Sequence, residues 1–158
     1  MSNDDEDGAN CLWPDYAVDR VLLDIGGSEE VLTSNAVEAY ARLAQVWRLS
    51  PADAAAMLAM PLARLLSLWE RRTCPPLDQD EILRIAILVD IYNLLAPIFG
   101  SDDAAIWPSL SNLQAPFLGR SPIATLKSGD FGTFIEARQC VQIMWLGYHS
   151  QRNSAVTG

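Results

Sequence analysis

The longest apolar stretch of this 158-residue chain, Ile82 to Phe99, constrains its fold more than any other feature. The stretch has about the length of a membrane span, but Arg84, Asp90 and Pro97 interrupt it. A helix that is apolar on nearly all sides is typical of the centre of a globular fold. We therefore expect a buried central helix with the rest of the chain packed around it, in which Arg84 pairs with a carboxylate such as Asp80 or Asp90, and we expect no membrane contact.

Helical periodicity extends over most of the remaining chain, and no segment alternates as a strand does. The fold class is therefore predicted to be all-α, an irregular bundle of about seven helices. The predicted helices cover residues 33–49, 51–58, 61–72, 81–99, 101–107, 122–129 and 132–146.

Capping residues mark the expected helix starts, and glycines mark the expected ends. The expected N-caps are Ser34 or Asn35, Ser50, Asp78 or Asp80, Ser101 to Asp103, and Ser121. Gly100 and Gly147 are expected to end the helices before them. The predicted divisions are an acidic leader at 1–32, a helix-turn-helix unit at 33–76, a second helical domain at 77–148 and a polar tail at 149–158.

The net charge of −9 is distributed unevenly. Residues 1–33 hold nine acids and one base, Arg20, whereas residues 34–73 hold five arginines and three acids. Strong overall acidity disfavours nucleic-acid binding unless cations gather on one face. The segment 34–73 is therefore the only candidate for a DNA-binding face. Cys11, Cys74 and Cys140 lie far apart, and residues 1–10 are too polar for a secretory signal, which favours a cytoplasmic protein.

Residues 50–71 have the layout of a helix-turn-helix, with two short helices joined by a tight turn. Pro61, Leu62 and Ala63 at the start of the second helix offer few groups that could read base edges. The candidate phosphate-binding residues are Arg64, Ser67, Arg71 and Arg72. The alternative is a helical hairpin with solvated arginines, and the residues alone leave both interpretations open.

An ordered series of residues runs through the second half of the chain. The series is Leu83-Arg84-Ile85, Ile91-Tyr92, Leu95, Phe99, Ala104-Ala105-Ile106-Trp107, Ser111-Asn112, Gly119-Arg120-Ser121-Pro122, Leu126 and Gly129. It resembles the Xre/MbcA/ParS toxin-binding domain, and with the preceding helix-turn-helix the resemblance covers residues 33–148. The chain departs from the family pattern at Pro108 and in a slightly long loop at 112–119.

The resemblance implies an antitoxin of a bacterial type II toxin–antitoxin pair. The implied partner is a RES-domain toxin, which consumes NAD, or a related ADP-ribosyltransferase toxin, whose active site the antitoxin covers. Such antitoxins act as homodimers within a larger complex and often repress their own operon. The candidate toxin-binding residues are Trp107, Asn112, Gly119, Arg120, Ser121, Pro122, Gln151 and Arg152.

Several of these residues also have purely structural explanations. Trp107 can anchor the core, Asn112 can satisfy loop backbone groups, and Gly119 can supply a positive φ. Ser121-Pro122 is a common helix start. No catalytic set, metal site or cofactor site can be assembled from the sequence, so we do not expect an enzyme. The alternative function is a helix-turn-helix transcriptional regulator without a toxin partner.

Overall fold

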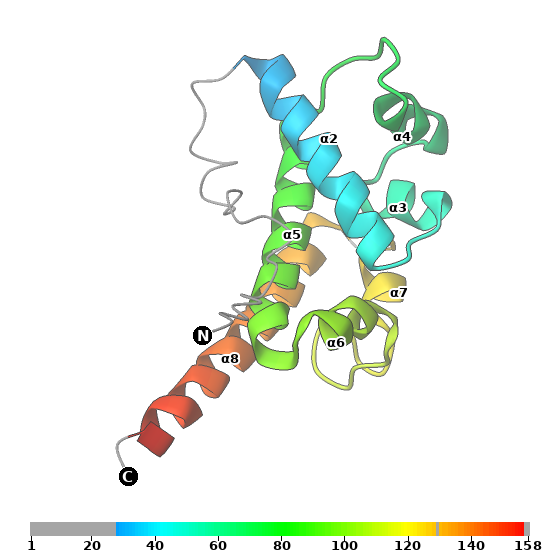
Figure 1. Ribbon diagram of the computed structural model, residues 1–158. Coiled ribbons are helices and arrows are strands. Elements are labelled where there is room, and N and C mark those ends of the chain that lie inside the picture. The colour runs from blue at the N-terminus through cyan, green and yellow to red at the C-terminus, as the bar shows by residue number, and fades with distance from the viewer. Residues whose placement is uncertain (1–27, 129, 157–158) are drawn as a thin grey trace.

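The computed structural model describes residues 28–128 and 130–156, in which the regular elements are all helices and no strand occurs. This confirms the predicted all-α class. Figure 1 shows the arrangement of the elements. They are α2 (Glu29–Val46), α3 (Pro51–Met57), α4 (Leu62–Trp69), α5 (Gln79–Phe99), α6 (Ser101–Ile106), a 3-10 turn η1 (Trp107–Ser109), α7 (Pro122–Leu126) and α8 (Phe131–Val156).

Helix α5 runs through the middle of the molecule and contacts α2, α6 and α8. The five consecutive residues from Ile85 to Val89 are all buried, so neighbours cover the helix on every side there. Among the described residues, α5 is long and apolar enough to cross a membrane. However, 61% of its most apolar 18-residue stretch is buried within the fold. Such burial is typical of the core helix of a globular protein.

The charged side chains of α5 are all engaged by nearby groups. Asp78 and Glu81 form a capping box, in which each carboxylate accepts a hydrogen bond from the other residue's backbone N–H. Arg84 pairs with Asp80 at 2.8 Å, as expected, and its guanidinium lies 4.7 Å from the ring centroid of Phe134 in α8. Asp90 pairs instead with Arg138 of α8, so α5 and α8 are joined by both packing and charge.

Helix α2 begins earlier than predicted, at Glu29, with Ser28 as its N-cap. Neither Ser34 nor Asn35 caps it, which corrects the sequence prediction and moves residues 29–32 from the leader into the helix. Glu29 and Glu30 in the first turn stabilise this start because their charges complement the helix dipole. The leader's residues 1–27 lie outside the described part of the chain.

Helix α3 begins where the sequence predicts, whereas α4 begins at Leu62, one residue after the predicted start, with Pro61 at its N-cap. The Ser50 hydroxyl accepts a hydrogen bond from the Asp53 N–H at 3.1 Å, and Pro51 occupies the first helical position. Ala59 takes a left-handed φ of 53° in the turn, and the chain direction changes by 104° between α3 and α4. The buried Tyr40 hydroxyl donates to the Ala54 carbonyl at 2.8 Å, which ties α2 to α3, and burial raises the pKa of this phenol.

In the second half of the chain, the end of α5 and the N-cap of α7 match the prediction, whereas the N-cap of α6 does not. Gly100 ends α5 with a φ of 84°, and the Ser121 hydroxyl caps α7 at 3.2 Å from the Ala124 N–H. Gly100 also stands at the N-cap of α6, where no side chain caps the helix. The expected cap at Ser101 to Asp103 is therefore wrong, because Asp102 and Asp103 lie within the first turn instead.

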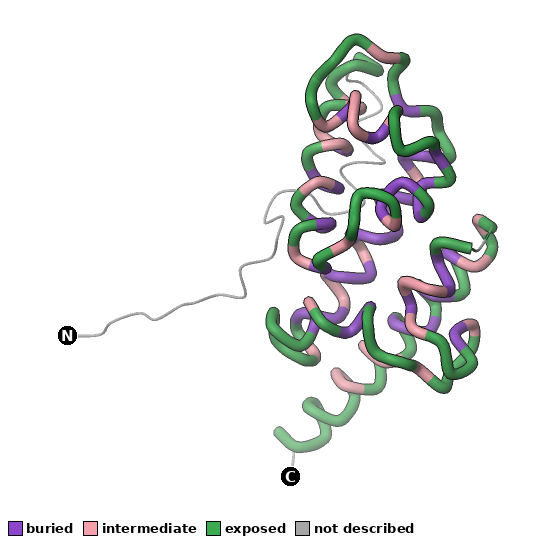
Figure 2. Tube along the Cα trace, turned by 90° about the vertical axis from the view of Figure 1, so that its right-hand side faces the viewer, coloured by how far each residue is buried: buried purple, intermediate pink, exposed green. Residues whose placement is uncertain are grey.

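Helix α8 does not end at Gly147, as the sequence predicted, but continues to Val156. A glycine inside a helix costs only about 1 kcal/mol, which the favourable contacts of the flanking turns can offset. Residues 149–156 of the predicted polar tail are therefore helical. Figure 2 shows this end of α8 as an exposed arm beyond the buried part of the fold.

The two glycines predict opposite responses to alanine. Gly100→Ala forces an L side chain into a backbone region that is open mainly to glycine, and should lower the free energy of unfolding by about 1–3 kcal/mol. Gly147→Ala is the matched control, because its Cβ would meet open space in an exposed helix, and it should raise helicity without loss of stability. Urea unfolding followed by circular dichroism measures both, and equal losses in both variants would contradict the assignment.

Candidate protein-binding surface

The loop between η1 and α7 is held by its own backbone. Asn112 exchanges hydrogen bonds with the far side of the loop, accepting from the Gly119 N–H at 2.7 Å and donating to the Arg120 carbonyl at 3.1 Å. Its side-chain oxygen accepts from the Gln114 N–H at 2.9 Å. Gly119 has the positive φ that the sequence suggested, 92°. The loop is therefore fixed without help from a partner.

Two leucines at the outer edge of this loop are exposed to an unusual degree. Leu113 is 85% exposed and Leu118 is 75% exposed. Phe117, between them in sequence, is fully buried and meets the ring of Trp107 edge to face, with 5.6 Å between centroids. The loop is thus anchored from inside and presents aliphatic side chains outward.

Burial corrects two of the predicted toxin contacts. Trp107 is only 9% exposed and Pro122 is buried, so neither side chain is available to a partner on the outer surface. Both support the loop from below. Ser121 acts as the N-cap of α7, and exposed Arg120 donates to the Ala124 carbonyl at 2.8 Å and lies 3.4 Å from the Ser128 hydroxyl.

The loop packs beside the middle of α8. The Cys140 thiol lies 3.3 Å from the side-chain oxygen of Gln114, and burial raises the pKa of this thiol. The loop therefore contacts α8 near Cys140. From here α8 continues past the end of α5 as the projecting arm, defined as residues 142–156, of which Met144 still packs against the core.

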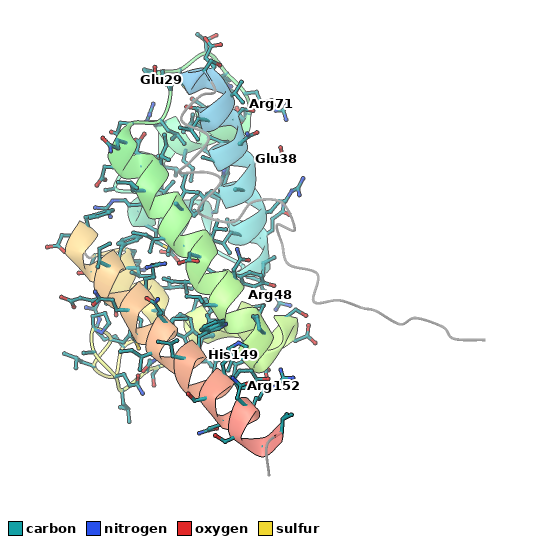
Figure 3. All side chains as sticks on the ribbon, turned by 90° about the vertical axis from the view of Figure 1, so that its left-hand side faces the viewer. Glu29, Glu38, Arg48, Arg71, His149 and Arg152 are labelled. Atoms are coloured by element: carbon teal, nitrogen blue, oxygen red, sulfur yellow. The ribbon has the colours of Figure 1, made fainter. Side chains whose placement is uncertain are left out.

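One side of the projecting arm carries an aromatic cluster with a cation. The rings of Trp145 and His149 are 4.1 Å apart between centroids, and Tyr148 meets His149 edge to face at 5.5 Å. The Arg152 guanidinium lies 5.7 Å from the Tyr148 ring centroid. Figure 3 shows His149 and Arg152 on this arm. Gln151 and Arg152, both predicted as contacts, are exposed on it.

Another side of the arm carries two exposed aliphatic residues, Ile143 at 69% and Leu146 at 54%. Their spacing of three places them on one helix face, away from the face that buries Phe134, Ala137 and Val141. Sequence reasoning missed both, because it followed only the buried stripe and ended the helix at Gly147. The signal that could have found them is their position off that stripe.

The predicted DNA-binding residues do not form one cationic face. Arg64 is a structural residue: it forms two hydrogen bonds with Glu81, at 2.8 and 3.0 Å, and donates to the carbonyls of Pro75 and Pro76 at 3.0 Å. The hydrogen bond with Glu81 raises the pKa of this guanidinium. This corrects the expectation that Arg64 holds a phosphate.

The other three residues of that set lie near the end of α4. The Ser67 hydroxyl donates to the Ala63 carbonyl within the helix, and Arg72 pairs with Glu70 at 2.7 Å. Arg71 is exposed, with a left-handed φ of 53° in the turn after α4. Of the four predicted residues, only Arg71 and Arg72, at the end of α4, are therefore exposed cations that could meet a phosphate.

The chain matches no protein-family model, no curated protein and no solved structure. Among residues 28–128 and 130–156, no group of three or more His, Cys, Asp or Glu side chains could hold a metal ion.

Removal of the arginine should destabilise the fold more in the pair Arg64–Glu81 than in the pair Arg72–Glu70. Arg64→Ala leaves Glu81, whose side chain is only 10% exposed, without its partner. We expect a loss of about 2–3 kcal/mol in unfolding free energy. Arg72→Ala is the matched control, since its pair with Glu70 is 71% and 49% exposed, and should cost no more than about 0.5 kcal/mol. Thermal and urea unfolding test this, and a neutral Arg64→Ala would refute the structural role.

Proposed function

We propose that this chain is an antitoxin-type binding protein that neutralises a toxin enzyme by covering its active site. The observation that carries the proposal is the projecting arm of α8, which presents Ile143 and Leu146 to solvent beyond the fold. The exposed loop residues Leu113 and Leu118 supply a second apolar contact on the same domain. The resemblance of residues 33–148 to the Xre/MbcA/ParS antitoxins supplies the expected partner, a RES-domain or ADP-ribosyltransferase toxin.

The composition of the arm supports a protein partner. Trp, Tyr and Arg are the residue types that most often dominate binding energy at interfaces, and Trp145, Tyr148 and Arg152 lie together here. The arm holds fifteen residues, so it extends about 22 Å. A helix of this length, with two exposed apolar residues three positions apart, fits a groove on a partner.

The arm and helix α6 differ in charge, and this difference suits them to different parts of a partner. Residues 142–156 contain no carboxylate, so the arm suits an apolar groove. Asp102 and Asp103 are exposed in the first turn of α6. An enzyme that holds the anionic NAD needs cations in its cleft, and these two carboxylates are suited to face them.

Substitution of the two exposed aliphatic residues tests the proposal directly. Ile143→Glu with Leu146→Glu should abolish both rescue of growth and co-purification with the co-expressed toxin, because two carboxylates would be buried in an apolar contact. The fold should be unchanged, since both positions are exposed.

The matched control is Val31→Glu with Leu62→Glu, which places the same charges on exposed apolar residues at the far end of the fold. This control should neutralise the toxin normally. Equal loss of neutralisation in both double variants, or retained neutralisation in the Ile143/Leu146 variant, would contradict the assigned surface. The neighbouring reading frame, which should encode the toxin, supplies the partner for the assay.

The alternative function, a helix-turn-helix regulator, has one supporting observation. The change of 104° between α3 and α4 lies in the range of about 90–120° that helix-turn-helix units show. The exposed start of α4, at Pro61, Leu62 and Ala63, carries no side chain that can hydrogen-bond to bases. Because these positions cannot read bases, operator binding by a homodimer is proposed only as a secondary, autoregulatory activity of the antitoxin.

Charge reversal at the end of α4 tests this second activity. Arg71→Glu with Arg72→Glu should abolish any salt-dependent shift of the chain's own upstream DNA, because both cations would then repel phosphates. Toxin neutralisation should be retained by the same variant. An unchanged DNA shift would exclude these residues as phosphate contacts, and a wild-type chain that shifts no DNA would leave antitoxin activity as the only function proposed.

A further inference from the structure

A groove of about 530 Å³ lies at the end of the molecule opposite the projecting arm, between the first turns of α2 and the end of α4. Its volume is in the range of sites that accept the side chains of a ligand or peptide. Its apolar lining is Val37, Ala41, Leu68, Trp69, Cys74, Pro75 and Pro76. Neither the proposed toxin-binding surface nor the loop contributes to it.

The rim of this groove carries both signs of charge. Glu29, Glu30 and Glu38 stand on the α2 side, and Arg71 and Arg72 stand on the α4 side. Figure 3 shows Glu29, Glu38 and Arg71 around this end of the fold. A complementary occupant therefore needs an apolar face flanked by at least one cation and one or more carboxylates.

The chain's own leader has this composition. Val18, Val21, Leu22 and Ile25 recur at the spacing of one helix face. Arg20, the only base in residues 1–28, lies among them with Asp19 and Asp24. Gly26-Gly27 then separates this segment from Ser28, the N-cap of α2.

We propose that leader residues 18–25 occupy this groove, with the four apolar side chains against Val37, Leu68 and Trp69. The leader joins α2 at Ser28, next to Glu29, which itself lines the groove. Attachment at this point gives the segment an effective local concentration of about the millimolar range, so even a weak contact is populated. Arg20 then supplies a cation for Glu29 and Glu30, and the leader aspartates supply a negative charge for Arg71.

Cys74 reports on the groove without any engineered probe. It lines the groove and is half-buried, with a free thiol. In the full-length chain, Leu22→Asp should expose Cys74 and raise its rate of maleimide labelling several-fold, as measured by mass spectrometry of the Cys74 peptide. Cys140 is 7% exposed and serves as the internal control, because its labelling rate should not change unless the fold opens.

Leu23→Asp is the matched control variant, since it makes the same substitution on the other side of the leader's helical pattern. Its Cys74 labelling rate should equal that of the unmodified chain. An unchanged rate in Leu22→Asp, or equal increases in both variants, would overturn the proposal. Protection of Cys74 that disappears on dilution would assign the groove to a second copy of the chain and would also overturn it.

Discussion

Helix α5 can remain in water only because two groups of helices cover it, and the rest of the fold follows from that requirement. Its residues from Ile85 to Val89 are buried consecutively, so no side of this segment is left for solvent. Helix α2, from the first half of the chain, contacts it, and so do α6 and α8 from the second half. Each side chain of α5 that carries charge is engaged, with Arg84 held by Asp80 and Asp90 held by Arg138. Burial of this one helix therefore sets the positions of α2, α6 and α8.

The shared core also joins the two predicted halves of the chain. Arg64 of α4 bonds to Glu81 of α5, and Lys127, just after α7, pairs with Asp53 of α3 at 3.0 Å. Residues 33–76 and 77–148, which the sequence predicts to be separate units, therefore share one hydrophobic core. A change at either end of this core therefore alters the stability of both halves.

The sequence predicted the features whose causes are local. Ser50, Asp78 and Ser121 cap helices because their oxygens accept bonds from N–H groups three residues on, and Gly100 ends α5 because it can take a positive φ. The errors arose where local signals compete. Ser28 and Ser34 are equally suitable caps, and Gly147 weakens α8 by too little to end it. The roles of Trp107 and Arg64 depend on partners far along the chain, such as Glu81, and no local pattern reveals such partners.

The effect of the chain's charge also depends on contacts between residues and not on local sequence alone. Counting residues gives the segment 34–73 a net positive charge, which favours a DNA-binding face. In the structure, three of its five arginines are engaged by carboxylates, since Arg42 pairs with Glu38, Arg64 with Glu81 and Arg72 with Glu70. Paired cations offer a phosphate much less attraction than the count implies, because the neighbouring carboxylate repels it. Among the described residues, the proposed contact with another protein therefore rests on exposed apolar side chains, such as Ile143 and Leu146, and not on cations.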